Sequence, residues 1–250
     1  MNPQGKTALI TGGAHRVGKA ITLALARAGA NVVINYRSSA QAAQDTASAA
    51  RALGVQALPV QADIADNGQV RAMIQLAEEQ FGSVDILVNS ASFYRQTPFP
   101  TEDHRGWLQV TRIGIDGPYY CANAVAPGML ARGQGVIVNI TDLSAFEPWP
   151  GFIAHSVSKA ALMALTRQLA LELAPAVRVN AVAPGPVLPP DDYSPERIAR
   201  TADKTLLGRW GTPEDVAEAV LYFVWADYVT GDILFIDGGE RFGHRKYEGG

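Results

Sequence analysis

Short apolar runs alternate along the chain with longer segments in which apolar residues recur every three or four positions. Runs of about four to eight apolar residues bounded by Gly, Pro, Asn or Asp are typical of buried strands, and the longer periodic segments are typical of helices. The pattern predicts strands at 6–11, 31–35, 55–61, 84–88, 136–140, 177–182 and 232–236. It predicts helices from the first glycine turn to about 28, and at 40–53, 69–81, about 104–132, about 153–173 and 213–225.

The regular alternation of strands and helices indicates an α/β fold. Such an order is typical of a Rossmann-like, doubly wound parallel sheet, here of about seven strands flanked by helices. No Pro/Ser-rich linker divides the 250 residues, so we expect a single domain over 1–250, with a polar tail at 240–250. The proline-broken stretch from 187 to about 207 reads as a lid or pocket wall, or else as a disordered surface loop.

Composition narrows the possible partners and compartment. A formal charge of −3 without a basic cluster argues against nucleic acid as a partner. No apolar run reaches the ~20 residues that cross a bilayer, and the N-terminus lacks the pattern of a signal peptide. Cys121 is the only cysteine, so the chain forms no internal disulfide. We expect a cytoplasmic protein that acts on a small molecule and requires no metal.

A glycine-rich turn follows the first strand. The segment contains Gly12, His15, Arg16, Val17 and Gly18 and leads into a helix. Backbone N–H groups at such a turn, together with the positive end of the helix, bind the pyrophosphate of a dinucleotide. The arginine, at the place of the usual middle glycine, could pair with a phosphate as well. The alternative is an ordinary tight connection between strand and helix.

The second strand leads into Tyr36, Arg37 and Ser38. An acidic residue here would accept hydrogen bonds from the adenosine ribose, whereas arginine and serine suit a 2′-phosphate. The sequence therefore predicts NADPH rather than NADH. The alternative reading of Arg37 is a solvated loop residue.

Other strand ends supply further candidates for the cofactor site. Asp63, followed by Ile64, could reach the adenine or cap the next turn. Small and amide residues after the fourth strand let a flat ligand approach the backbone, and two aromatic residues behind them either stack on the substrate or pack under the next loop. These residues, with the turn after the sixth strand, are Asn89, Ser90, Ala91, Phe93, Tyr94, Pro184, Gly185 and Val187.

The segment from 136 to 173 contains the candidate catalytic residues. Asp142 follows a strand, at the edge where ligands meet a parallel sheet, and His155 and Lys159 are four residues apart on one helix face. A carboxylate, an imidazole and an amine in one crevice form a plausible acid–base set. Taken alone, the same residues could be a turn former, a helix N-terminal residue and a solvated lysine.

With these residues in view, the chain resembles the short-chain dehydrogenase/reductase family from about Lys6 to Gly239. The resemblance rests on the glycine turn, Asp63, the 89–92 segment, and further landmarks at 158–161, 178–180, 184–185, 211–215, 229–231 and 237–239. Arg16, the Arg37-Ser38 pair and Asp142 resemble the pteridine reductases within that family. This implies NADPH, a pterin stacked between the nicotinamide and either Phe93 or Tyr94, Lys159 on the nicotinamide ribose, and a homotetramer.

Two residues depart from the family pattern, and both concern proton delivery. His155 occupies the position of the usual tyrosine donor, and Gly114 that of an asparagine that positions a water relay. We expect Asp142, His155 and a bound water to share proton delivery, with Asp142 also contacting the substrate and turnover slow. The alternatives are an NADPH-binding sensor without turnover, and a reductase of non-pterin ketones in which His155 is an adapted donor.

Overall fold

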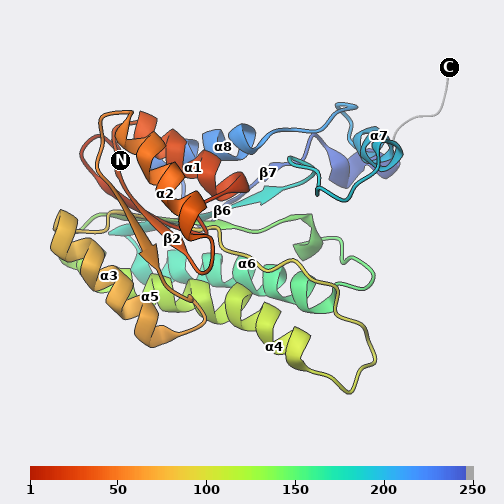
Figure 1. The fold of residues 1–250 in the computed structure, drawn as a ribbon, viewed down its shortest axis with the longest axis horizontal. Coiled ribbons are helices and arrows are strands. Elements are labelled where there is room, and N and C mark those ends of the chain that lie inside the picture. Colours follow the sequence, from red (N-terminus) through yellow and green to blue (C-terminus); the bar gives the residue numbers. More distant parts are fainter. Residues whose placement is uncertain (246–250) are drawn as a thin grey trace.

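Seven parallel strands form one sheet in the computed structural model, which describes residues 1–245 (Figure 1). Their order is β3-β2-β1-β4-β5-β6-β7, so the direction of winding reverses between β1 and β4. The strands are β1 Thr7–Thr11, β2 Asn31–Tyr36, β3 Ala57–Gln61, β4 Ile86–Asn89, β5 Gly135–Ile140, β6 Val177–Pro184 and β7 Ile233–Ile236. The predicted Rossmann-like α/β fold is confirmed.

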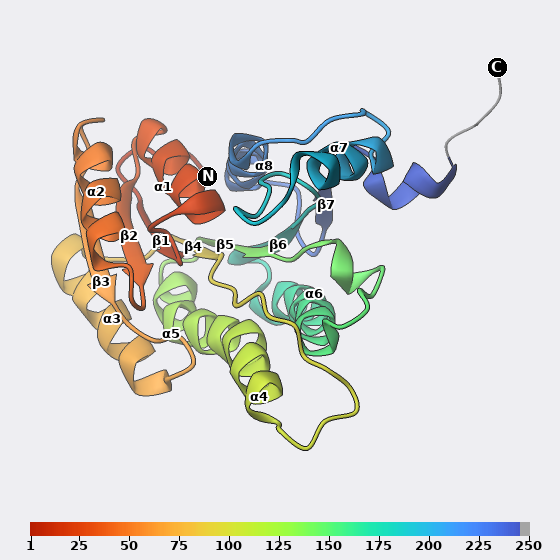
Figure 2. The ribbon, with the colours of Figure 1, turned by 45° about the vertical axis from the view of Figure 1, so that its right-hand side comes forward.

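Helices cover both faces of the sheet (Figure 2). On one face lie α1 Arg16–Arg27, α2 Ala40–Arg51 and α8 Pro213–Trp225, and on the other lie α3 Asn67–Phe81, α5 Gly117–Ala131 and α6 Ile153–Leu173. α4 Arg105–Thr111 precedes α5, and α7 Pro195–Lys204 lies beside a short 3₁₀ helix at Glu240–Arg245. No helix among the described residues is long and apolar enough to cross a membrane. Part of the predicted polar tail, 246–250, lies outside the described residues.

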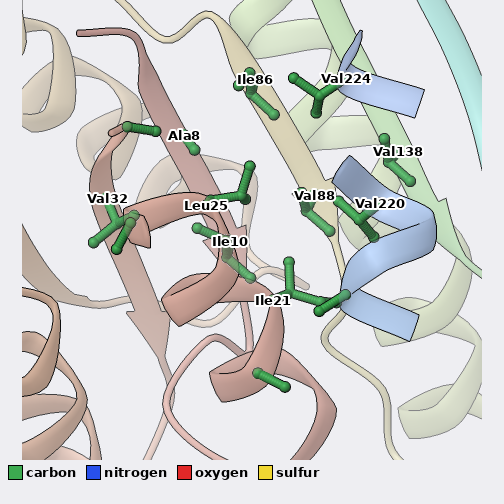
Figure 3. Packing of buried hydrophobic residues seen from close by; sticks show 14 of the residues in the cluster. Ala8, Ile10, Ile21, Leu25, Val32, Ile86, Val88, Val138, Val220 and Val224 are labelled. Carbon is green, nitrogen blue, oxygen red and sulfur yellow. The ribbon is translucent and has the colours of Figure 1, made fainter. Parts of the chain in front are cut away.

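The hydrophobic core forms two layers because strand side chains alternate between the faces. Ala8 and Ile10 of β1 face α1 and α8, where they pack with Ile21 and Val220 (Figure 3), whereas Leu9 points into the opposite layer. Since both faces are covered, the strands are predominantly apolar. Burial of a Leu or Ile side chain stabilises the fold by about 1.5–3 kcal/mol. The C-terminal strand ends are held in place by this packing.

The structure adds two features to the predicted helices. The segment expected as one helix at 104–132 is divided by a π-helical turn at Arg112–Asp116. Gly114 lies in this turn, where a Cβ atom would be 2.7 Å from the Cβ of Ser158 on α6. The close approach of the two helices therefore depends on the absence of a side chain at position 114.

The other added feature is α7, which lies within the stretch predicted to be a lid, wall or loop. Ser194 caps its N-terminus by accepting a hydrogen bond from the Arg197 N–H, and Pro195 occupies the first turn. The same combination starts α8, where Thr212 precedes Pro213. Ser-Pro-Glu at 194–196 is thus a helix start that the proline-rich surroundings hid.

Candidate active site

A cavity of about 1380 Å³ lies along the C-terminal ends of the strands. It extends across the reversal point between β1 and β4, where open parallel sheets bind ligands. Its volume exceeds the 300–1000 Å³ of sites for drug-sized ligands, so it can hold an extended ligand and a second molecule.

The glycine turn forms one end of this cavity. Gly12 has a φ of 63°, and a Cβ atom on it would be 2.9 Å from the Cα of Ala91. A Cβ atom on Gly18 would collide with the Gly12 carbonyl, so a side chain is excluded at Gly18 as well. Arg16, with a φ of 52°, is the only non-glycine residue in the left-handed region among residues 1–245. The N-terminus of α1, with no acidic residue in its first turn, is open to an anion.

Arg37 and Ser38 line the cavity beside this turn, at the end of β2. The Arg37 guanidinium carbon lies 6.0 Å from the centre of the Phe93 ring, which therefore belongs to this end of the cavity. Asp63 also lines the cavity, and its carboxylate accepts a hydrogen bond from the Ala65 N–H at 2.9 Å. Asp63 thus caps the turn; contact with an adenine stays a prediction.

Asp142 and His155 are directly hydrogen-bonded. His155 Nε2 lies 2.6 Å from one carboxylate oxygen of Asp142, and the other oxygen accepts hydrogen bonds from the backbone N–H and hydroxyl of Ser144. The His155 side chain is 4% exposed and that of Asp142 17% exposed. His155 Nδ1 is buried and has no hydrogen-bond partner within residues 1–245. The carboxylate, rather than the imidazole, is therefore the more open member of the pair.

Lys159 lies one helical turn after His155, and its Nζ donates a hydrogen bond to the Ile140 carbonyl at 2.8 Å. Burial lowers the pKa of Lys159, and the nearby Asp142 carboxylate partly opposes this. Burial would by itself raise the pKa of Asp142. The hydrogen bond from His155 and the charge of Lys159 outweigh that effect and lower this pKa below its usual value. Asp142 is accordingly a carboxylate at neutral pH.

Aromatic rings surround the pair, two of them not anticipated from the sequence. Tyr94 stacks on Phe152 with ring centres 4.6 Å apart, and it meets the His155 ring edge-on at 5.2 Å. Trp149 is nearly parallel to the His155 ring at 5.9 Å. Trp149 and Phe152 lie in the Pro/Gly-broken connection before α6. This segment has no helical or strand periodicity, so the sequence does not show which of its side chains face a site. Of the two candidate stacking residues, Tyr94 lies beside the acid–base pair and Phe93 beside Arg37.

Most of the predicted site residues converge on this cavity. Those that line it are Gly12, His15, Arg16, Val17, Gly18, Tyr36, Arg37, Ser38, Asp63, Ile64, Ser90, Ala91, Phe93, Tyr94, Asp142, His155, Lys159, Pro184 and Gly185. Asn89 and Val187 do not: the first is buried and bonds to Asn139 across β4 and β5 at 2.8 Å, and the second packs in the core. Their predicted roles in cofactor binding stay predictions.

Residues from the 187–211 stretch also line the cavity. The sequence predicted a lid, a pocket wall or a loop there without identifying the lining residues. Tyr193, Arg197 and Trp210 lie there, with Arg197 stacked 3.7 Å from the centre of the Tyr193 ring. Within residues 1–245, no three His, Cys, Asp or Glu side chains are grouped so that they could hold a metal ion.

Comparison with known proteins agrees with this geometry. A family model described as enoyl-(acyl carrier protein) reductase matches residues 12–240. A 3beta-hydroxysteroid dehydrogenase of Eggerthella lenta is 37% identical over 244 residues, which cover 94% of each protein.

Two similar crystal structures contain nicotinamide cofactors. A gluconate 5-dehydrogenase from Burkholderia cenocepacia, in complex with NADP and tartrate, superposes with a TM-score of 0.88 at 32% identity, covering 95% of this chain and 96% of that one. An NAD+-bound xylitol dehydrogenase superposes with a TM-score of 0.89 at 25% identity, covering 96% and 100%. The chain belongs to the short-chain dehydrogenase/reductase family, whose members are oxidoreductases that use a nicotinamide cofactor.

Proposed function

We propose that this protein is an NADPH-dependent, pteridine-reductase-like enzyme. It would transfer hydride to a pterin, a dihydropterin or a similar flat substrate with a C=N or C=O bond. The proposal rests on one observation: Asp142, His155 and Lys159 line the same cavity as the glycine turn and Arg37. A dinucleotide site and an acid–base set are thus combined, as a reductase requires.

The residues of the cavity fit a bound NADPH. The N-terminus of α1 suits the pyrophosphate, and Arg16, Arg37 and Ser38 suit the 2′-phosphate. Lys159 would hold the nicotinamide ribose, as the family resemblance implies. When bound, the reduced cofactor supplies the hydride.

Asp142 and His155 would control the delivery of a proton to the substrate. Their single hydrogen bond fixes the orientation of the imidazole, and the carboxylate faces the cavity, where it can orient a water or a substrate N–H group. The hydrogen bond from His155, together with the charge of Lys159, keeps this carboxylate ionised. Tyr94, stacked on Phe152, offers an aromatic wall to a flat substrate.

Two other functions have specific support. Because His155 and Gly114 both depart from the family pattern of proton delivery, the chain could bind NADPH as a sensor without turnover. The similarity to a hydroxysteroid dehydrogenase supports reduction of a non-pterin ketone.

The experiment that separates these functions combines binding and turnover. NADPH and NADH are titrated by fluorescence, and NADPH oxidation is then followed with dihydrobiopterin, dihydrofolate and a panel of ketones. We expect tighter binding of NADPH and oxidation with the pterins. Oxidation with ketones alone identifies the ketone reductase, and NADPH binding without oxidation identifies the sensor. Absence of binding at millimolar cofactor contradicts all three.

The family resemblance also supports a homotetramer. Light scattering on the purified protein tests the assembly: a mass near four times the 26.6 kDa of one chain is expected.

A further inference from the structure

We propose that the phenol of Tyr94 gives the final proton to the substrate, in place of a donor at position 155. The inference rests on the reductase activity proposed above. It assigns Tyr94 a catalytic role beyond stacking. Asp142 and His155 then position and polarise the substrate and do not donate the proton.

The imidazole of His155 has no free path to a substrate. Its Nε2 is bonded to Asp142 at 2.6 Å, and its Nδ1 is buried without a partner within residues 1–245. The rings of Tyr94 and Trp149 lie against it, one edge-on and one nearly parallel. A proton on either nitrogen therefore stays inside the protein unless the Asp142 bond breaks.

The other two members of the predicted set are equally unsuited to final donation. Asp142 carries no proton at neutral pH, because its pKa lies below the usual value. The Lys159 ammonium is buried and already donates to the Ile140 carbonyl. Its two other N–H groups are the ones that would hold the nicotinamide ribose in the function proposed above, so neither Asp142 nor Lys159 is the final donor in this proposal.

Tyr94 has the properties that these three groups lack. It lines the cavity and is 52% exposed, and its hydroxyl forms no hydrogen bond within residues 1–245. Its ring is held by stacking on Phe152 and by the edge contact with His155. A phenol thus lies beside the acid–base pair, on a neighbouring segment of chain rather than on α6.

Burial raises the pKa of Tyr94, so the phenol keeps its proton at neutral pH. The charged and titratable groups that face it come from both sides of the cavity: Asp142 and His155 on one side, and Asp192, Tyr193 and Arg197 on the other. Tyr193, Asp142 and Asp192 act in the same direction as burial, and Arg197 opposes them.

The proton transfer balances without a further reactant. When hydride is added to the carbon of the C=N or C=O bond, the π-electron pair would move to the nitrogen or oxygen, the O–H bond of Tyr94 would break, and its proton would bind that nitrogen or oxygen. The anion formed, an alkoxide or a nitrogen anion, is a far stronger base than a phenolate, whose conjugate acid has a pKa of ~10. The transfer is therefore downhill without a cation to lower the phenol pKa.

The phenolate then takes a proton from solvent, to which Tyr94 is open. A donor at this position needs no buried water relay, which agrees with the absence of a polar side chain at Gly114. Proton donation by Tyr94 thus explains both departures from the family pattern, at His155 and at Gly114.

The test compares Tyr94→Phe with Tyr119→Phe. Tyr119 is a matched control, since it is 50% exposed, lies on α5 and does not line the cavity. For Tyr94→Phe we expect kcat to fall about 10²–10⁴-fold while the Kd for NADPH stays within about twofold, because the stacking ring is kept. The control should match the wild type. An unchanged kcat in Tyr94→Phe, with an active wild type, overturns the proposal.

Two further measurements exclude a merely structural role. In the wild type, kcat should fall only as the pH rises above ~10, where a phenol loses its proton; a fall near the imidazole value overturns the proposal. An ultraviolet difference titration of tyrosinate, wild type minus Tyr94→Phe, should show one phenol with a raised pKa. A wild type that binds NADPH but reduces no substrate contradicts the proposed function instead, and this inference with it.

In a second variant, His155→Tyr is added to Tyr94→Phe. The kcat of this double variant should be at least tenfold higher than that of Tyr94→Phe alone, because the cation of Lys159 lowers the pKa of a neighbouring phenol. Failure of this rescue, together with a wild-type pH profile that lacks the high-pH fall, overturns the assignment to Tyr94.

Discussion

The two ends of the cavity are built in different ways. The glycine turn offers mainly backbone: Gly12 and Gly18 allow close approach, and the N-terminus of α1 supplies N–H groups. The other end, which we propose to be the reaction end, offers side chains from separate segments, chiefly Tyr94, Asp142 and His155. A backbone site tolerates few substitutions, because any side chain fills it. A side-chain site can keep its chemistry while the individual groups change.

The largest effect is expected at the reaction end. Asp142→Ala removes the hydrogen-bond partner of His155 Nε2 and the carboxylate charge near the buried Lys159, and leaving a buried charge without its counter-charge costs about 3–5 kcal/mol. We expect this loss in the free energy of unfolding, measured by denaturant titration, with a strong loss of kcat. The matched control is Asp103→Ala, which removes an exposed carboxylate paired with Arg105 at 2.8 Å and should leave stability nearly unchanged. Equal losses in both variants would contradict the charge pairing described here.

A side chain at the glycine turn should act on binding first. Gly18→Ala forces a Cβ against the Gly12 carbonyl, and overpacking of this kind costs about 1–3 kcal/mol. We expect at least tenfold weaker NADPH binding by fluorescence titration. Gly54→Ala is the control, because Gly54 does not line the cavity and nothing lies within 4 Å of an added Cβ, although its positive φ, of 88°, strains the alanine backbone. If NADPH binding is unaffected by Gly18→Ala, the glycine turn is not the pyrophosphate site.

Cofactor preference should depend on Arg37. A hydrogen bond to a charged group contributes about 1.5–3 kcal/mol, so Arg37→Ala should weaken NADPH binding about 10–100-fold and leave NADH binding nearly unchanged. Arg51→Ala is a suitable control, because Arg51 donates to the Ala57 carbonyl and does not line the cavity. A parallel loss for both cofactors would mean that Arg37 does not contact the 2′-phosphate.

The smallest effect is the response of stability to acid. Because the pKa of Asp142 is lower in the folded state, its contribution is complete above the unfolded value near ~3.9 and disappears as the pH falls through the folded value. Wild type should lose more stability between about pH 5 and 2 than Asp142→Asn, as measured by thermal unfolding. Identical slopes would show that Asp142 is not stabilised as a carboxylate.

Much of the fold followed from local patterns. The seven strands, the glycine turn and the start of α8 at Thr212-Pro213 were predicted within a few residues, because each depends on neighbours in the chain. α7 was missed although Ser194-Pro195-Glu196 is a helix start of the same kind. The π-helical turn at Gly114 was also missed, since it depends on contact with Ser158 of α6.

The sequence by itself determined the α/β class, the order of elements and the set of polar groups at the strand ends, because periodicity and turn residues act over short distances. Only the tertiary structure decided that Tyr94, rather than Phe93, lies beside His155, that Trp149 and Phe152 complete the aromatic wall, and that both nitrogens of His155 are enclosed. Those facts depend on how segments six to about sixty residues apart pack together, and no local pattern in the chain encodes the direction of a side chain across such a contact.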